Sequence, residues 1–161
     1  MAEQLSISNR ESADIASNPL KAAAALSLAA AMIHASVIAG HFREYWLFGL
    51  FFTLSAILQL VWAGLVWSGR EERWLLWVGA LGNLAVALLW LYTRTVGLPI
   101  GPEAGETEVA GIHDVLATAS ELGLAALLGL RFAGRAPGQW VLWAAWILAA
   151  VSGVAAFLGP H

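Results

Sequence analysis

The stretch LFGLFFTLSAILQLVWAGLVW (residues 47–67) contains no charged residue and a single side-chain amide, that of Gln59. A transmembrane α-helix needs about 20 consecutive apolar residues, so this stretch is long enough to cross a lipid bilayer. Of the 161 residues in the chain, 60% are hydrophobic and only 12% are charged. A soluble domain of this size cannot bury so much apolar surface. The composition therefore predicts an integral membrane protein that contacts the lipid bilayer.

Four further apolar segments lie on either side of this one, at residues 20–40, 74–95, 109–130 and about 139–158. We predict an all-α fold, a polytopic membrane protein with a five-transmembrane-helix bundle. Asn18 and Pro19 are typical of a helix start, because asparagine caps the first turn and proline suits the first helical position. Residues 1–18 are predicted to form a polar cytoplasmic tail, and residues 19–161 a single transmembrane helical bundle domain. A cleaved signal peptide is the competing interpretation of the first apolar segment, although the tail before it is not net positive.

Basic residues are distributed unevenly between the two sides that this topology defines. The side of the N-terminal tail holds Arg10, Lys21, Arg70, Arg73, Arg131 and Arg135, and the other side holds Arg43 and Arg94. Cytoplasmic loops carry an excess of lysine and arginine. We therefore predict a multi-pass protein of the cell membrane with its N-terminus inside and its C-terminus outside. The junction at residues 41–46 and the loop at residues 94–108 should then meet at the extracytoplasmic side.

Ionisable residues are concentrated in EAGETEVAGIHDVLATASE (residues 103–121), much of which belongs to the fourth apolar segment. An ionisable residue inside a membrane span is costly and marks a functional site. His34 and His41 are seven residues apart, as are Asp114 and Glu121, so each pair lies on one face of its helix. We expect an outer polar layer that contains His41, Glu44, Glu108, His113 and Asp114. An inner layer should contain His34 and Glu121, with Asn83 and Gln59 somewhat deeper.

The outer layer offers ligands for a metal ion. His41 and Glu44 are three residues apart, so both side chains lie on one side of a helix. Imidazole and carboxylate groups suit Zn, Fe or Mn, and helical bundles build metal sites from such pairs on facing helices. His113, Asp114 and Glu108 are the complementary candidates. We therefore predict a divalent metal-binding or redox site at the extracytoplasmic side.

Three alternatives to the metal site stay open. Glu44 could pair with Arg43 or Arg94 at the membrane interface, while Glu106 and Glu108 favour the positive end of the fourth helix. The second alternative is a single haem b. Its two axial ligands must lie at equal depth in the membrane, and His41 with His113 is the only histidine pair that meets this condition. In the third, His34 and Glu121 handle protons; Glu121 lies about 16 Å along its helix from the outer end, which is near the middle of the membrane.

The loop RTVGLPIGPEAGE (residues 94–106) contains two prolines and three glycines, which divide the backbone into successive turns. Such a loop is more typical of an ordered lid than of a mobile linker. We expect it either to cover the outer polar layer and exclude water or simply to join two helices.

Two motifs resemble a known group of proteins. The junction HFREYW (residues 41–46), followed by Gly49, Phe51 and Phe52, and the loop TRTVGLPIGP (residues 93–102), followed by Gly105, Glu106, Glu108 and Asp114, carry the likeness. They resemble uncharacterised small multi-pass membrane proteins of actinobacterial type, over the first four predicted helices. The resemblance implies a shared architecture, with the histidine before the aromatic junction and the TRTxGxPxGP loop as its pattern, and it implies no activity.

Composition excludes several kinds of function. The chain contains no cysteine, which rules out disulfides, thiolate metal sites and cysteine nucleophiles. Its net charge is -3 and it has no basic run, so it has no signature of nucleic-acid binding.

Two alternatives to the metal or redox protein remain. The chain could be a small proton-coupled carrier or channel component, or a structural subunit of a larger membrane complex. A homo-oligomer or a partner membrane subunit is expected, and whether the chain is an enzyme stays open.

Overall fold

The computed structural model describes residues 18–158, and this part of the chain forms five α-helices and no β-strand. The helices are α2 (Pro19–Glu44), α3 (Trp46–Trp67), α4 (Arg73–Thr95), α5 (Ile112–Phe132) and α6 (Gln139–Leu158). Each of them is long and apolar enough to cross a membrane. The predicted all-α fold with a five-helix bundle is confirmed. The predicted tail at residues 1–18 lies outside the described residues except for Asn18.

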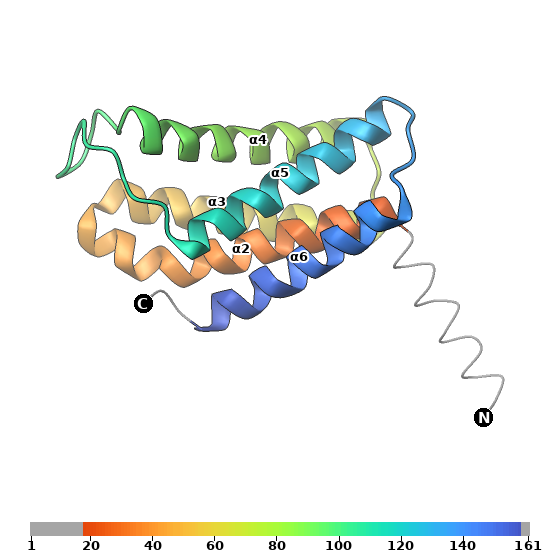
Figure 1. Cartoon of the computed structure of the whole chain (residues 1–161), viewed down its shortest axis with the longest axis horizontal. Coiled ribbons are helices and arrows are strands. Elements are labelled where there is room, and N and C mark those ends of the chain that lie inside the picture. Colours follow the sequence, from red (N-terminus) through yellow and green to blue (C-terminus); the bar gives the residue numbers. More distant parts are fainter. Residues whose placement is uncertain (1–17, 159–161) are drawn as a thin grey trace.

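Consecutive helices run in opposite directions, so the connections alternate between the two ends of the bundle (Figure 1). The α2–α3 junction at residues 41–46 and the α4–α5 loop at residues 96–111 lie at the same end, as expected, and we refer to it as the outer end. The connections at residues 68–72 and 133–138 lie at the opposite, inner end. The orientation of these ends relative to the cytoplasm stays a prediction.

Two helix boundaries differ from those expected. The first apolar segment was expected to end near Gly40, whereas α2 continues to Glu44 and only Tyr45 breaks the helix, with extended φ and ψ angles of -160° and 129°. The fourth helix begins at Ile112 rather than Val109, because Gly111 is its N-cap and the Asp114 carboxylate accepts a hydrogen bond of 2.9 Å from the Gly111 N–H. At the start of α2 the predicted cap is confirmed, since Asn18 Oδ1 accepts a hydrogen bond from the backbone N–H of Leu20 over 2.9 Å.

Helix α2 is the central helix of the bundle. It packs against α3, α5 and α6, and Figure 1 shows it between α3 and α6. Its buried face is rich in alanine, including Ala22, Ala23, Ala29 and Ala30. Small residues let helix backbones approach one another closely in membranes. The alanine-rich face of α2 therefore allows α3, α5 and α6 to pack closely around it.

The inner half of the bundle is closely packed. Leu26, Val66, Leu76, Leu124 and Leu128 are among the buried residues of a single hydrophobic cluster there. Helices α3 and α4 meet in this half, where the Trp62 indole donates a hydrogen bond of 2.8 Å to the Leu75 carbonyl oxygen. The indole also lies against Gly79, at a place that no β-carbon could occupy. Farther toward the outer end, a cavity lies between the two helices.

Candidate functional site

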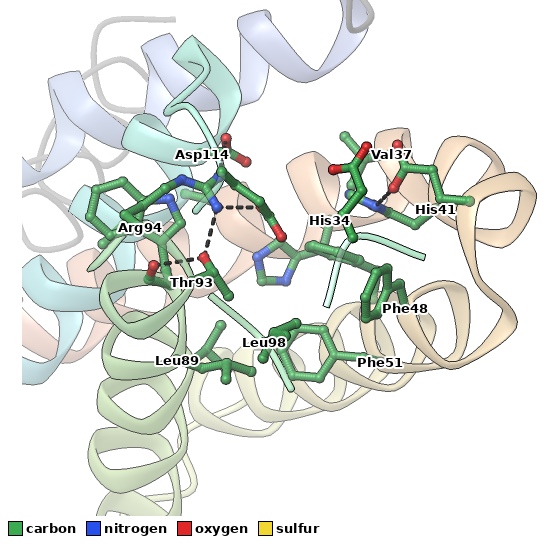
Figure 2. A pocket seen from close by; sticks show the side chains of 18 of the residues that line it. His34, Val37, His41, Phe48, Phe51, Leu89, Thr93, Arg94, Leu98 and Asp114 are labelled. Carbon is green, nitrogen blue, oxygen red and sulfur yellow. Dashed lines mark hydrogen bonds and ion pairs between the residues drawn. The ribbon is translucent and has the colours of Figure 1, made fainter. Parts of the chain in front are cut away.

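A pocket of about 820 Å³ occupies the outer half of the bundle. Helices α2, α3, α4 and α5 form its walls, and the loop at residues 96–111 contributes to its outer side. Small-molecule sites are typically concave, of about 300 to 1,000 Å³, and mostly apolar with a few convergent polar groups. This pocket has those properties. Figure 2 shows Arg94, Thr93 and Asp114 on one side, His41, Phe48 and Phe51 on the other, and His34 between them.

Four polar side chains from four helices meet at the deep end of the pocket. Gln59 of α3 donates hydrogen bonds from Nε2 to Glu121 Oε1 of α5 over 2.9 Å and to Asn83 Oδ1 of α4 over 3.0 Å. Asn83 in turn donates to the Gly79 carbonyl oxygen over 2.8 Å. His34 of α2 places Nε2 3.5 Å from Glu121 Oε1. The four residues predicted for the inner layer therefore contact one another, and we refer to them as the inner cluster.

Two members of the inner cluster also line the pocket, namely His34 and Glu121. Their exposed fractions are 4% and 1%, so they are closed off from bulk solvent by the surrounding helices. His34 contacts the Phe52 ring edge-on, with 5.4 Å between the ring centroids. Its Nδ1 atom is buried and has no hydrogen-bond partner among the described residues. The pocket thus ends at the Glu121 carboxyl group and at the His34 imidazole, whose Nδ1 atom makes no hydrogen bond within the described part of the chain.

Arg94 dominates the outer part of the pocket. Its Nη2 lies 2.7 Å from Asp114 Oδ2, and its Nη1 contacts both Thr93 Oγ1, over 2.7 Å, and the Glu108 carboxylate. The guanidinium also lies 5.5 Å from the centroid of the Trp90 ring. With an exposed side-chain fraction of 13%, Arg94 is largely buried. Arg94 therefore links α4 to the start of α5 and neutralises two of the carboxylates predicted as metal ligands.

Backbone hydrogen bonds within the loop at residues 96–111 and to the end of α4 hold the loop in place. Gly105 N–H donates to the Leu98 carbonyl oxygen over 2.7 Å, and Glu108 N–H donates to the Thr93 carbonyl oxygen over 3.1 Å. Gly97 has a φ angle of +82° and packs against the backbone of Glu106, where a β-carbon would not fit. The glycines of the loop thus permit a folded structure over the pocket, in line with the expected ordered lid. That it excludes water from the pocket stays a prediction.

The predicted metal ligands do not converge. His41 Nδ1 and Glu44 Oε2 are 2.9 Å apart and face the pocket, but Asp114 and Glu108 are both bound to Arg94. His113 Nε2 lies 3.1 Å from the Ala155 carbonyl oxygen of α6, on the side of α5 away from the pocket-lining residues. Within residues 18–158, no group of three or more His, Asp or Glu side chains could hold a metal ion. The pairing of His41 with His113, expected for a haem b, is likewise not formed in this arrangement.

The structure also brings residues to the pocket that the sequence interpretation did not select. Phe48, Phe51 and Phe52 form an aromatic wall on α3, and Trp90 and Thr118 line the opposite side. Phe51 and Phe52 were noted only as part of the resemblance, and large apolar side chains are so common in residues 47–67 that none of the three rings stands out as a pocket residue. Trp90 lies near the end of the apolar segment at residues 74–95, where tryptophan is common at the membrane interface and so does not indicate a pocket. Which of these rings face the pocket depends on how each helix is rotated about its own axis, and the structure is needed to show that rotation.

No protein-family model, curated protein or solved structure matches the chain. The resemblance to small multi-pass membrane proteins of actinobacterial type therefore stays a prediction, and the site is interpreted from its own geometry.

Proposed function

We propose that this chain is an integral membrane protein that binds a small amphipathic molecule in the pocket. We further propose that Glu121 and His34 exchange a proton when the molecule enters or leaves. The position of Glu121 is the observation that carries the proposal, because this side chain is 1% exposed and yet lines a cavity of about 820 Å³. Ionisable side chains at such depth are expensive and mark ligand or proton pathways.

A proton-coupled carrier is a specific form of this proposal. It is favoured by the contrast between the two halves of the bundle, since the pocket ends at Glu121 and the inner half is filled by the hydrophobic cluster around Leu124 and Leu128. A carrier exposes its site to one side at a time, whereas a channel needs a continuous path. If the carrier form is correct, a pH gradient across liposomes will drive ligand uptake, and Glu121→Gln will abolish that coupling.

Metal or redox chemistry at the outer end is a weaker proposal. His41 and Glu44 face the pocket and together offer one imidazole and one carboxylate. Binding of Zn, Fe or Mn by this pair would require further ligands, and Glu108 and Asp114 could supply them only by leaving Arg94. Elemental analysis and an absorption spectrum of the purified protein test both a metal ion and haem b. One metal ion per chain in the purified protein, and its loss in the His41→Ala variant, would support this proposal.

The carboxyl reagent dicyclohexylcarbodiimide tests whether the pocket is open to a small apolar molecule. This apolar carbodiimide modifies carboxyl groups in the membrane phase and is small enough for a cavity of about 820 Å³. We expect one adduct per chain, located at Glu121 by peptide mass spectrometry. The adduct should be lost in Glu121→Gln and retained in Glu71→Gln, because Glu71 lies at the inner end and pairs with Arg131.

Absence of an adduct at Glu121 would overturn the proposal. A water-soluble carbodiimide provides the reference in that case, because it should still modify exposed carboxylates such as Glu103 and Glu72. If the exposed carboxylates react and Glu121 does not react with the apolar reagent, the pocket is closed to small molecules. It would then be a packing defect rather than a binding site.

A further inference from the structure

We infer that the ligand of this pocket is a hydrophobic organic cation, such as a protonated or quaternary amine carried on an apolar body. This inference rests on the proposed function, because it names the class of molecule that the same pocket binds. Its first basis is the charge of the lining residues. Toward the outer end they include five carboxyl groups, those of Glu44, Glu103, Glu106, Glu108 and Asp114, against one guanidinium, that of Arg94, and no lysine.

The single guanidinium does not neutralise this excess. Arg94 pairs with Glu108 and Asp114, and none of the ion pairs formed within residues 18–158 involves Glu103 or Glu106. A cleft with walls of low dielectric constant that is lined by one sign of charge concentrates ligands of the opposite sign. The mouth of the pocket therefore attracts cations and repels anions.

The deep end of the pocket points to the same class of ligand through a different group. His34 is 4% exposed, and its Nδ1 atom is without a hydrogen-bond partner in the described part of the chain. When Nε2 carries the proton and faces Glu121, the Nδ1 atom presents a lone pair, because a neutral imidazole has one donor nitrogen and one acceptor nitrogen. A lone pair and the Glu121 carboxyl group together suit a ligand that donates hydrogen bonds or carries positive charge.

The walls between mouth and deep end supply apolar and aromatic surface. Phe48, Phe51 and Phe52 line the pocket on α3 and Trp90 lines it on α4. Aromatic faces attract organic cations within about 6 Å of the ring centroid. Arg94 is one cation that already makes both kinds of contact, because its guanidinium pairs with Asp114 and lies 5.5 Å from the centroid of the Trp90 ring. The pocket thus combines the two features that recognise a hydrophobic cation: negative charge and aromatic surface.

Two probes of matched shape and opposite charge test the inference. Tetraphenylphosphonium and tetraphenylborate have nearly the same size and apolar surface, so a difference between them reports charge alone. We expect calorimetry in detergent to show saturable binding of tetraphenylphosphonium that is at least about tenfold tighter than that of tetraphenylborate. Binding to protein-free micelles is subtracted for each probe. Glu121→Gln should weaken the cation about tenfold or more.

Matched variants separate the site from the general charge of the protein. Glu71→Gln makes the same chemical change at the inner end and should leave the affinity unchanged, whereas Glu106→Gln, in the exposed loop, should weaken it about two- to threefold. Equal weakening by Glu71→Gln, tighter binding of tetraphenylborate, or no binding of either probe would overturn the cation inference. Modification of Glu121 by dicyclohexylcarbodiimide in those cases would show that the pocket itself still accepts small molecules.

Discussion

Gln59 on α3 donates a hydrogen bond of 2.9 Å from Nε2 to Oε1 of Glu121 on α5, so one amide joins two of the helices that bound the pocket. The same nitrogen donates to Asn83 Oδ1 on α4. The deep end of the pocket is therefore a hydrogen-bonded unit rather than a set of isolated polar groups. These two hydrogen bonds join α3 to α4 and α5, while Gln59 Oε1 and His34 Nδ1 have no partner among the described residues.

Replacing Gln59 by leucine should destabilise the bundle modestly. The Gln59→Leu variant loses both interhelical hydrogen bonds, and such bonds in membrane proteins contribute on average about 0.6 kcal/mol each and at most about 1.7 kcal/mol. We expect the free energy of unfolding to fall by about 1 kcal/mol in a denaturant titration in micelles. Gln139→Leu is the matched control, because Gln139 is exposed at the start of α6. Equal effects of the two variants would show that the inner cluster does not stabilise the fold.

A pair of glycines in α4 tests the packing of the inner half. Gly79 lies against the Trp62 indole and leaves no room for a β-carbon, whereas Gly82 on the same helix has open space. Overpacking of a core typically costs about 1 to 3 kcal/mol, so Gly79→Ala should lower the thermal unfolding temperature. Gly82→Ala should be neutral or slightly stabilising, because alanine is the better helix former by about 1 kcal/mol. A Gly79→Ala protein as stable as Gly82→Ala would contradict the α3–α4 contact.

Arg94 should control the order of the outer loop. Arg94→Gln removes the charge that binds Glu108 and Asp114, and hydrogen bonds to charged groups contribute about 1.5 to 3 kcal/mol. We expect amide hydrogen exchange in residues 96–111 to accelerate about tenfold or more. Arg43→Gln makes the same change at an exposed position of the outer end and should have no such effect. Unchanged exchange in Arg94→Gln would mean that the backbone hydrogen bonds alone hold the loop.

The orientation of the bundle can be tested because the chain has no cysteine. A membrane-impermeant maleimide added to intact cells should label Glu103→Cys, at the outer end, without disruption of the membrane. It should label Arg70→Cys, at the inner end, only after permeabilisation, since the excess of basic residues predicts that this end is cytoplasmic. Both positions are exposed. The reverse pattern would show that the N-terminus is outside.

The sequence predicted the fold and much of the inner cluster for identifiable physical reasons. Apolar segments of about 20 residues match the thickness of the membrane, and their positions predicted all five helices. The spacing of seven residues placed His34 with His41, and Asp114 with Glu121, on common helix faces, and all four residues line the pocket. Asn83 and Gln59 were expected somewhat deeper than His34 and Glu121, and both belong to the inner cluster.

The outer layer was harder to predict, because spacing along one helix does not show which neighbour that helix faces. His113 is adjacent to Asp114 in the sequence, yet about 100° of helical rotation separates them, and the imidazole contacts Ala155 of α6 instead of the pocket. Arg94 links α4 to α5 through its contact with Asp114. These two residues are 20 positions apart in the sequence, so spacing along one helix does not predict the contact. The cavity could not be predicted from the hydrophobic pattern. That pattern shows which segments avoid water, but it does not show whether side chains fill the space between the helices.

Thiol reactivity on α5 tests the central claim most directly, namely that the outer half of the bundle contains an accessible pocket ending at Glu121. Thr118 and Ser120 are both buried, but Thr118 lines the pocket whereas Ser120 faces Ser152 of α6, with 3.2 Å between their hydroxyl oxygens. We predict that N-ethylmaleimide modifies the Thr118→Cys variant at least about tenfold faster than Ser120→Cys, since reaction requires access to the thiol. Equal rates, or faster modification of Ser120→Cys, would contradict the pocket.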